Sequence, residues 1–195
     1  MFRLFWIMVF AAFLAGCGSA TPWGAVYGTV VDERSTAQIA QDRQIKTRIE
    51  AAYASDSEVS YFGITPYAFL NEAYIVGEYS SEMERDKALQ IARTTEGVYR
   101  VHHYLLPKQD SECGFMDRQQ MRAELNYELY GTSGVSATNI ELSIVQCDVV
   151  LVGIVGSQAE IDKAISIVKA IEGVKNVKSF LRTMPRPGTT GSRKS

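Results

Sequence analysis

Histidine, tryptophan and cysteine are scarce in this chain, and their scarcity limits its chemistry. The 195 residues include two histidines, two tryptophans and three cysteines. His102 and His103 are neighbours, and neighbouring residues of a strand point to opposite faces, so they are poorly placed to bind one metal ion. No serine or acid stands at a spacing that pairs with them as a catalytic set. We therefore predict no catalytic residue, no metal site and no cofactor: the protein is not an enzyme.

An excess of positive charge is also absent. Twenty Lys and Arg residues stand against 22 Asp and Glu residues, a formal net charge of −2. Proteins that bind nucleic acid carry a basic patch or stripe that neutralises phosphates. Nucleic acid is therefore not an expected partner.

Long apolar runs are missing except at the N-terminus, where residues 4–16 are apolar or small. This run is shorter than the roughly 20 residues of a transmembrane helix. A single positive charge at Arg3, an apolar run and small residues at its end are typical of a secretory signal peptide. We expect residues 1–16 to be removed.

The apolar run ends in Leu14-Ala-Gly-Cys17, which resembles the lipobox of bacterial lipoproteins. The resemblance implies that Cys17 receives a diacylglycerol and, with a further acyl chain such as palmitate, becomes the first residue of the mature protein. Position 18 is Gly rather than the Asp that tends to mark inner-membrane lipoproteins, which implies the periplasmic face of the outer membrane. The alternative is an ordinary signal peptide with Cys17 as an incidental thiol.

The two remaining cysteines are Cys113 and Cys147. A chain that folds in an oxidising envelope can join them in a disulfide. Sequence alone does not show that two cysteines come close enough to bond. A bridge and two free thiols both stay open at this point.

The chain repeats itself at an offset of 76 residues. Val76-Gly77 matches Val152-Gly153, and Glu96-Gly97-Val98 matches Glu172-Gly173-Val174. Identities that stay in register over this length, with apolar positions kept, indicate a duplicated unit. Further matches are Ser81 with Ser157, Asp86-Lys87-Ala88 with Asp162-Lys163-Ala164, Ile91 with Ile167 and Val101 with Val177.

Each unit begins with a helical pattern and continues with a hairpin. Apolar residues recur at a spacing of four, which is typical of one buried helix stripe. In the second unit, residues 139–145 partly alternate and a solid apolar run at 149–152 follows a short turn, so we expect the run to be a strand buried on both sides. The helical stripes are Ile45, Ile49 and Tyr53 in the first unit and Met121, Leu125 and Leu129 in the second.

A second helix and a last strand complete each unit. Ser81 with Glu84, and Ser157 with Glu160, fit the capping box at a helix start. A glycine, Gly97 or Gly173, then ends the helix, and a last strand is expected from residues 98 and 174. The order α-β-β-α-β gives an α+β fold in which each unit is a mixed three-stranded sheet with two helices.

The pattern Val-Gly-x-Val-x-Ser-x-x-Glu, an amphipathic helix and Ile-Glu-Gly-Val-x-x-Val resembles the BON domain. The likeness covers residues 40–106 and 116–182. We expect a signal peptide at 1–16, a lipidated linker at 17–39, BON-like domains at 40–107 and 116–182, a linker at 108–115 and a disordered tail at 183–195. The resemblance implies a periplasm-facing envelope protein whose domains bind phospholipid or dock on other envelope components.

The start of the second unit is the candidate contact surface. Phe115 and Met116 are large apolar residues, and Arg118 and Arg122 share one helix face. Such a set can dip into a bilayer interface while the guanidinium groups meet lipid phosphates. The alternative is that Phe115 and Met121 are core residues and that the arginines are ordinary surface charges.

The leading interpretation is a non-catalytic outer-membrane lipoprotein that supports envelope integrity. Its partners would be the membrane, through the lipid on Cys17, and anionic phospholipid, through the BON-like domains. The alternative is a protein-docking adaptor for an envelope assembly or cell-wall factor.

Overall fold

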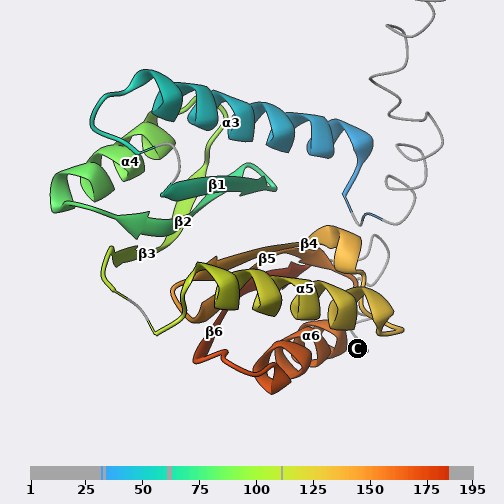
Figure 1. Cartoon of the computed structure of the whole chain (residues 1–195). Helices are drawn as coiled ribbons and strands as arrows, with labels where there is room; N and C mark the ends of the chain where they lie inside the picture. Colours follow the sequence, from blue (N-terminus) through green and yellow to red (C-terminus); the bar gives the residue numbers. More distant parts are fainter. Residues whose placement is uncertain (1–31, 33, 61–62, 111, 185–195) are drawn as a thin grey trace, which may run out of the picture. The chain divides into compact units, whose positions relative to one another are not determined.

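The computed structural model describes residues 32, 34–60, 63–110 and 112–184, all within one compact unit that spans residues 32–195. Cys17, the predicted signal peptide and most of the predicted tail lie outside the described residues. Domain 1 follows the predicted order (Figure 1): α3 Thr36–Ser55, β1 Ile64–Phe69, β2 Glu72–Tyr79, α4 Glu82–Thr94 and β3 Arg100–Pro107.

Domain 2 has the same order, with one short 3-10 turn added before its first strand. The α-β-β-α-β prediction is therefore confirmed for both units. The last strands begin two residues later than predicted, because the amides of Val98 and Val174 are still bonded in the turns that follow the helices. The elements are α5 Phe115–Gly131, η1 Ala137–Asn139, β4 Ile140–Val145, β5 Asp148–Val155, α6 Gln158–Ala170 and β6 Asn176–Thr183.

Each domain contains one mixed sheet in which the second strand of the domain lies in the centre. The strand orders are β1-β2-β3 and β4-β5-β6. The hairpin pairs are antiparallel, and the last strand runs parallel to the middle one. A parallel neighbour requires a crossover, which α4 and α6 provide.

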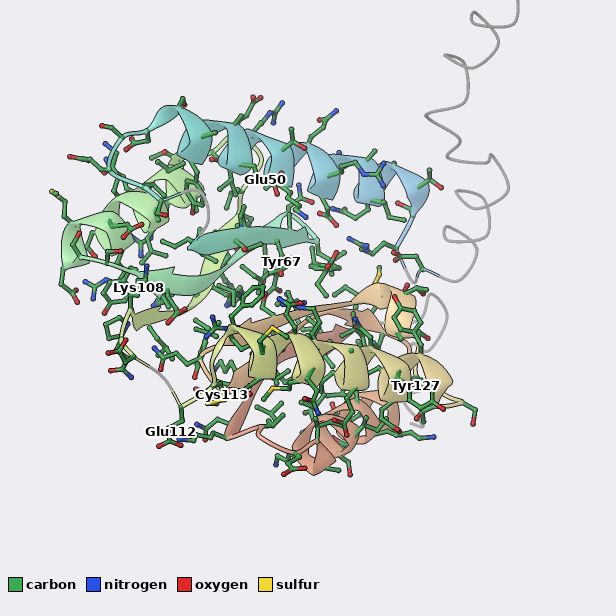
Figure 2. All side chains as sticks on the ribbon, in the orientation of Figure 1. Glu50, Tyr67, Lys108, Glu112, Cys113 and Tyr127 are labelled. Atoms are coloured by element: carbon green, nitrogen blue, oxygen red, sulfur yellow. A yellow bond between two sulfur atoms is a disulfide. The ribbon has the colours of Figure 1, made fainter. Side chains whose placement is uncertain are left out.

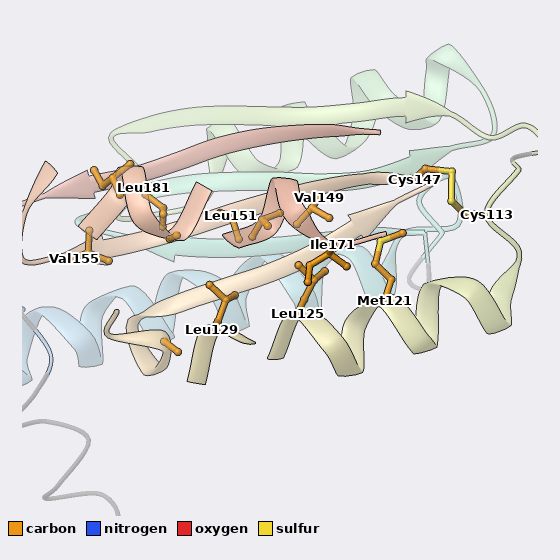
Figure 3. Packing of buried hydrophobic residues seen from close by; sticks show 14 residues of the cluster. Cys113, Met121, Leu125, Leu129, Cys147, Val149, Leu151, Val155, Ile171 and Leu181 are labelled. Atoms are coloured by element: carbon orange, nitrogen blue, oxygen red, sulfur yellow. A yellow bond between two sulfur atoms is a disulfide. The ribbon is translucent and has the colours of Figure 1, made fainter. Parts of the chain in front are cut away.

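One face of each sheet packs on its two helices. In domain 2, Met121, Leu125 and Leu129 of α5 face Val149 and Leu151 of β5, as predicted (Figure 3). In domain 1 the stripe of α3 is buried in the same way, with its side chains at most 2% exposed. Burial of such a side chain contributes about 1.5–3 kcal/mol.

The other faces of the two sheets pack against each other. Alternate residues of β5, Val150 and Val152, point to domain 1 while their neighbours point to the helices, so the predicted burial on both sides is confirmed. The apolar contact is formed by Tyr67, Phe69, Tyr74 and Val76 of domain 1 with Val145, Val150, Val152 and Ile154 of domain 2.

The contact between the sheets is self-complementary. The hydroxyls of Tyr67 and Ser143 lie 2.6 Å apart, and these residues differ by 76 positions, which is the offset of the repeat. Equivalent residues that touch each other mark the axis of an isologous interface. The two domains therefore pair as a homodimer would, within one chain; Tyr67 is labelled in Figure 2.

The capping prediction was half right. Ser81 and Ser157 accept from the amides of Glu84 and Glu160, as predicted. The glutamates do not return to the cap residue. Each carboxylate instead bridges the residue before the cap and a distant loop: Glu84 accepts from Ser80 N and Ser60 N, and Glu160 from Gly156 N and Ser136 N.

Candidate functional site at the start of α5

The first turn of α5 is fixed to the hairpin of domain 2. Cys113 and Cys147 form a disulfide with their Cα atoms 5.5 Å apart. The next residue, Gly114, caps the helix and donates its amide to Asp117 Oδ2 at 2.8 Å. Cys113 lies just before α5 (Figure 2). Phe115, which we had placed in the linker, is the first residue of the helix.

The two arginines are held to backbone carbonyl groups. Arg118 Nη1 donates to Cys113 O at 2.8 Å, and Arg122 Nη1 donates to Leu142 O at 3.1 Å. Neither makes an ion pair among the described residues. A guanidinium has five N–H donors, so each arginine keeps donors for an anion.

The apolar residues divide between core and solvent. Met121 is buried at 4% exposure, as the alternative reading expected. Phe115 is 66% and Met116 74% exposed, so Phe115 does not belong to the core. Both side chains are available at the surface where the membrane-contact prediction needs them.

Two further exposed residues of α5 escaped the sequence analysis. Tyr127 is 77% and Tyr130 64% exposed, and Figure 2 shows Tyr127 in the C-terminal half of the helix. With Met116 and Ala123 they recur at helical spacing on the side opposite the buried stripe. This spacing is visible in the sequence and is the signal that identifies the face.

The two flanks of α5 differ in charge. Helical spacing places Phe115, Arg118 and Arg122 along one flank. The opposite flank carries Asp117 and Glu124, which line a cleft beside the disulfide together with Glu112, Glu172 and Lys175. The surface of α5 therefore passes from basic through apolar to acidic.

A buried carboxylate lies where the two domains meet. Glu72, 6% exposed, uses Oε2 to accept from His102 Nε2 at 2.7 Å and from Arg182 Nη1 at 2.8 Å. Burial alone would raise the pKa of Glu72, but these hydrogen bonds and charges lower it below its ordinary value. His102 also stacks on Tyr74, with ring centroids 4.8 Å apart, whereas His103 is exposed. Every partner is a protein group, which indicates a structural bond between domains.

The described residues contain neither a cluster of His, Cys, Asp and Glu suited to a metal ion nor a helix long and apolar enough to cross a membrane. The site residues that can be placed are thus those of α5 and the disulfide. They offer a surface with apolar and cationic groups.

Two curated proteins resemble this chain over most of their length. Osmotically-inducible protein Y of Escherichia coli (strain K12) is 28% identical over 145 residues, which cover 73% of this chain and 72% of that protein. Outer membrane lipoprotein DolP of Haemophilus influenzae is 23% identical over 169 residues, covering 85% of this chain and 87% of the relative.

Among solved structures, the chain matches two of CdsD, a structural protein of the type III secretion system of Chlamydia trachomatis. Both matches have a TM-score of 0.30 and cover 74% of this chain, at 16% and 18% identity. They cover 64% and 67% of the CdsD chains. This likeness is too weak to inform function.

The family comparison agrees with the internal repeat. The BON domain model matches twice, at residues 41–106 and 117–185. Each match contains the helix, hairpin, helix and strand described above, and together they span more than half of the chain. The protein therefore belongs to the BON domain family and carries two BON domains in tandem.

Proposed function

We propose that this protein is a lipid-anchored, non-catalytic envelope protein whose second BON domain contacts phospholipid on the periplasmic face of the outer membrane through α5. One observation carries the proposal: Phe115 and Met116 are 66% and 74% exposed at the start of a helix whose flank holds Arg118 and Arg122. Apolar residues beside arginines are the pattern of an interfacial helix.

The expected strength suits a tethered protein. Moving an exposed Phe or Met side chain into an apolar environment contributes about 1.5–3 kcal/mol. A basic residue near an anionic surface contributes about 1 kcal/mol. Part of this is lost in ordering the contact, so the domain alone would bind weakly. An anchor on Cys17 raises the effective concentration of lipid and makes a weak contact sufficient.

The charge difference across α5 sets its orientation on the lipid. Tyr127 and Tyr130 extend the apolar face of Met116, and tyrosine is favoured at membrane interfaces. The acidic flank with Asp117 and Glu124 would be repelled by anionic lipid. We expect α5 to lie along the surface and to tilt toward the flank of Arg118.

The relatives support the general role. The Haemophilus protein is named an outer membrane lipoprotein, and the Escherichia protein is named for osmotic induction. The name of the Haemophilus protein fits a location in the envelope. The lipobox-like Leu14-Ala-Gly-Cys17 supports the same location.

The test is co-sedimentation of residues 18–195, which lack Cys17, with neutral and with anionic phospholipid vesicles at two salt concentrations. We expect binding to anionic vesicles that weakens with salt, because exposed charges are screened. Arg118→Glu with Arg122→Glu should reduce binding at least tenfold, and Met116→Ser should reduce it at both salt concentrations.

Domain 1 offers matched controls. Met83 is 63% exposed on α4, and Met83→Ser should leave vesicle binding unchanged. The exposed Arg43 and Arg93 of domain 1 match the charge change, so Arg43→Glu with Arg93→Glu should have little effect. Unchanged binding in the α5 variants would refute the site. No binding to either vesicle would leave the protein-docking adaptor as the function.

A further inference from the structure

Strand β3 has a free edge. It is the outer strand of the first sheet and pairs only with β2 among the described residues. The backbone hydrogen bonds outside regular elements include none to residues 101–106 from another described segment. Alternate residues of β3 thus present backbone donors and acceptors that have no strand partner among the described residues, which is a template for one more strand.

The other three edges carry features that discourage strand addition. Pro66 lies within β1, Glu141 within β4, and Lys178 and Arg182 within β6. Proline and charged residues are common means of protecting sheet edges. β3 has an arginine and a proline only at its two ends, Arg100 and Pro107. From 101 to 106 it has neither proline nor a Lys, Arg, Asp or Glu, and its apolar side chains are only half-buried.

Positive groups surround this unprotected edge. Arg100 begins β3, Lys108 follows its end, and Arg93 stands on α4 near His103. All three cations are exposed and have no ion pair in the described part of the chain. Partial burial, together with the charges of Arg93 and Arg85, lowers the pKa of His103, in accord with a positive surrounding. Figure 2 labels Lys108.

We infer that the outer edge of β3 binds an extended, acidic peptide segment of a partner protein by strand addition. Main-chain hydrogen bonds along the edge would give affinity, and the cations would select acidic residues. Side chains of an added strand alternate between the two faces of the sheet. Arg93 lies on the helix side, so acidic residues on that face of the added strand meet a cation without an ion pair among the described residues.

The same charges disfavour the most obvious competitor, a second copy of the chain. Antiparallel pairing of two β3 strands would bring the cations of both copies together along one short edge, and like charges across a strand pair destabilise it. An acidic segment neutralises them instead. The inference does not depend on lipid contact through α5, which lies in the other domain.

The first experiment measures binding of a fluorescent ten-residue peptide of alternating Val and Glu to residues 18–195 by anisotropy. We expect binding that weakens with salt, and binding at least tenfold weaker for the matching Val and Lys peptide. Arg93→Glu should weaken binding of the acidic peptide at least fivefold. Lys169 is the repeat equivalent of Arg93 on α6, so Lys169→Glu is the matched control and should change binding less than twofold.

A second peptide pair separates strand addition from mere charge attraction. In an added strand, alternate amides point toward the edge and the others away from it. N-methylation of one alternate set should therefore abolish binding, while N-methylation of the other set should preserve it. Hydrogen exchange of β3 amides should slow at least tenfold with the unmodified peptide, and β6 amides should not change.

Three outcomes would overturn the inference. Equal loss or equal retention for the two methylated peptides would show that the backbone is not recognised. Equal effects of Arg93→Glu and Lys169→Glu would place the peptide elsewhere. A concentration-dependent dimer, measured by light scattering and lost on Leu105→Glu, would show that the edge pairs with a second copy.

Discussion

The two domains hold the same hairpin turn by different means. In domain 1, Leu70 and Asn71 form the turn with φ of 54° and 62°, and both amides donate to the buried carboxylate of Asp42 at 3.0 Å. In domain 2, the equivalent residues are Gln146 and Cys147. There the turn is joined by a disulfide to Cys113, just before α5.

In both domains the turn is thus bonded to the chain at or just before the first helix, by a carboxylate in one and by a disulfide in the other. Asp42 is also bonded by Arg34 Nη1 at 2.8 Å and by Gln38 Nε2 at 2.9 Å, so its charge is compensated. The position equivalent to Asp42 is Arg118, which binds Cys113 O and cannot accept the turn amides. Domain 2 thus lacks this acceptor and has a covalent bond instead.

The largest expected effect is removal of the disulfide. A closed loop of this size, with a sequence separation of 34, stabilises by about 4 kcal/mol in the chain-entropy model. Cys113→Ser with Cys147→Ser, or reduction of the native protein, should lower the free energy of unfolding by about that amount. Urea denaturation measures the loss, and hydrogen exchange should place it in β4 and β5.

Asp42→Ala is the counterpart in domain 1. It leaves the amides of Leu70 and Asn71 without this acceptor, at a cost of about 3 kcal/mol. Arg34 loses the bond of its Nη1 but keeps its ion pair with Asp32. This loss should be the same with and without reductant and should appear in the exchange of β1 and β2. If either variant changed the hydrogen exchange of both hairpins equally, the two turns would not be stabilised independently.

The next prediction concerns a close backbone contact that both domains share. A Cβ on Gly77 would lie 2.1 Å from Gly63 O, and one on Gly153 would lie 2.1 Å from Asn139 O. Gly63 and Asn139 are also 76 residues apart, which is the offset of the repeat. Because backbone cannot yield as a flexible side chain can, each substitution to Ala should cost about 3 kcal/mol. Gly77 has a φ of 147° in addition, so Gly77→Ala should lower the urea midpoint further than Gly153→Ala.

A glycine without such a close contact supplies the control. Gly131 has open space where a Cβ would stand, so Gly131→Ala should leave the midpoint nearly unchanged. A Gly153→Ala variant as stable as Gly131→Ala would mean that the strands separate enough to admit a methyl group.

Much of the fold could be predicted because its signals are local or repeated. The spacing of Ile45, Ile49 and Tyr53 predicts a helix stripe, and the 76-residue offset transfers each element of one unit to the other. The capping serines needed contacts only three residues away. Such signals involve neighbours along the chain, which a sequence shows directly.

The remaining features depend on segments that only the folded chain brings together. The bond from Glu84 to Ser60 N spans 24 residues, and the pair of Glu72 and Arg182 spans 110. Tyr67 and Tyr74 read as ordinary strand residues, and nothing local indicates that they face a second sheet. For the same reason the exposure of Phe115 could not be told from its apolar character.

The smallest expected effect concerns the two polar ends of the contact between domains, which differ in chemistry. At one end Glu72 binds Arg182, and at the other Tyr104 Oη donates to Asp148 Oδ2 at 2.5 Å. Residues 72 and 148 are repeat equivalents. Burial, the hydrogen bond to Asp148 and the negative charge of Asp148 raise the pKa of Tyr104 to about 12.

The stabilisation from the two bonds should therefore be lost at opposite limits of pH. The pKa of Glu72 is lowered from 4.5, so its stabilisation is present above pH 4.5 and is lost as pH falls through the folded value. The pKa of Tyr104 is raised from 10.0, so its stabilisation is present below pH 10.0 and is lost as pH rises toward 12. Each bond contributes about 1 kcal/mol.

Two variants separate these limits. Arg182→Gln removes one cause of the low Glu72 pKa, so the folded and unfolded pKa values lie closer together. The acid decline in the free energy of unfolding should therefore be smaller and end at higher pH, while the alkaline decline stays. Tyr104→Phe should remove one phenol that ionises near pH 12 in an absorbance titration and leave the acid decline in place. If both variants moved the same limit, the two ends of the interface would be coupled, and the domains would separate as one step rather than loosening from either end.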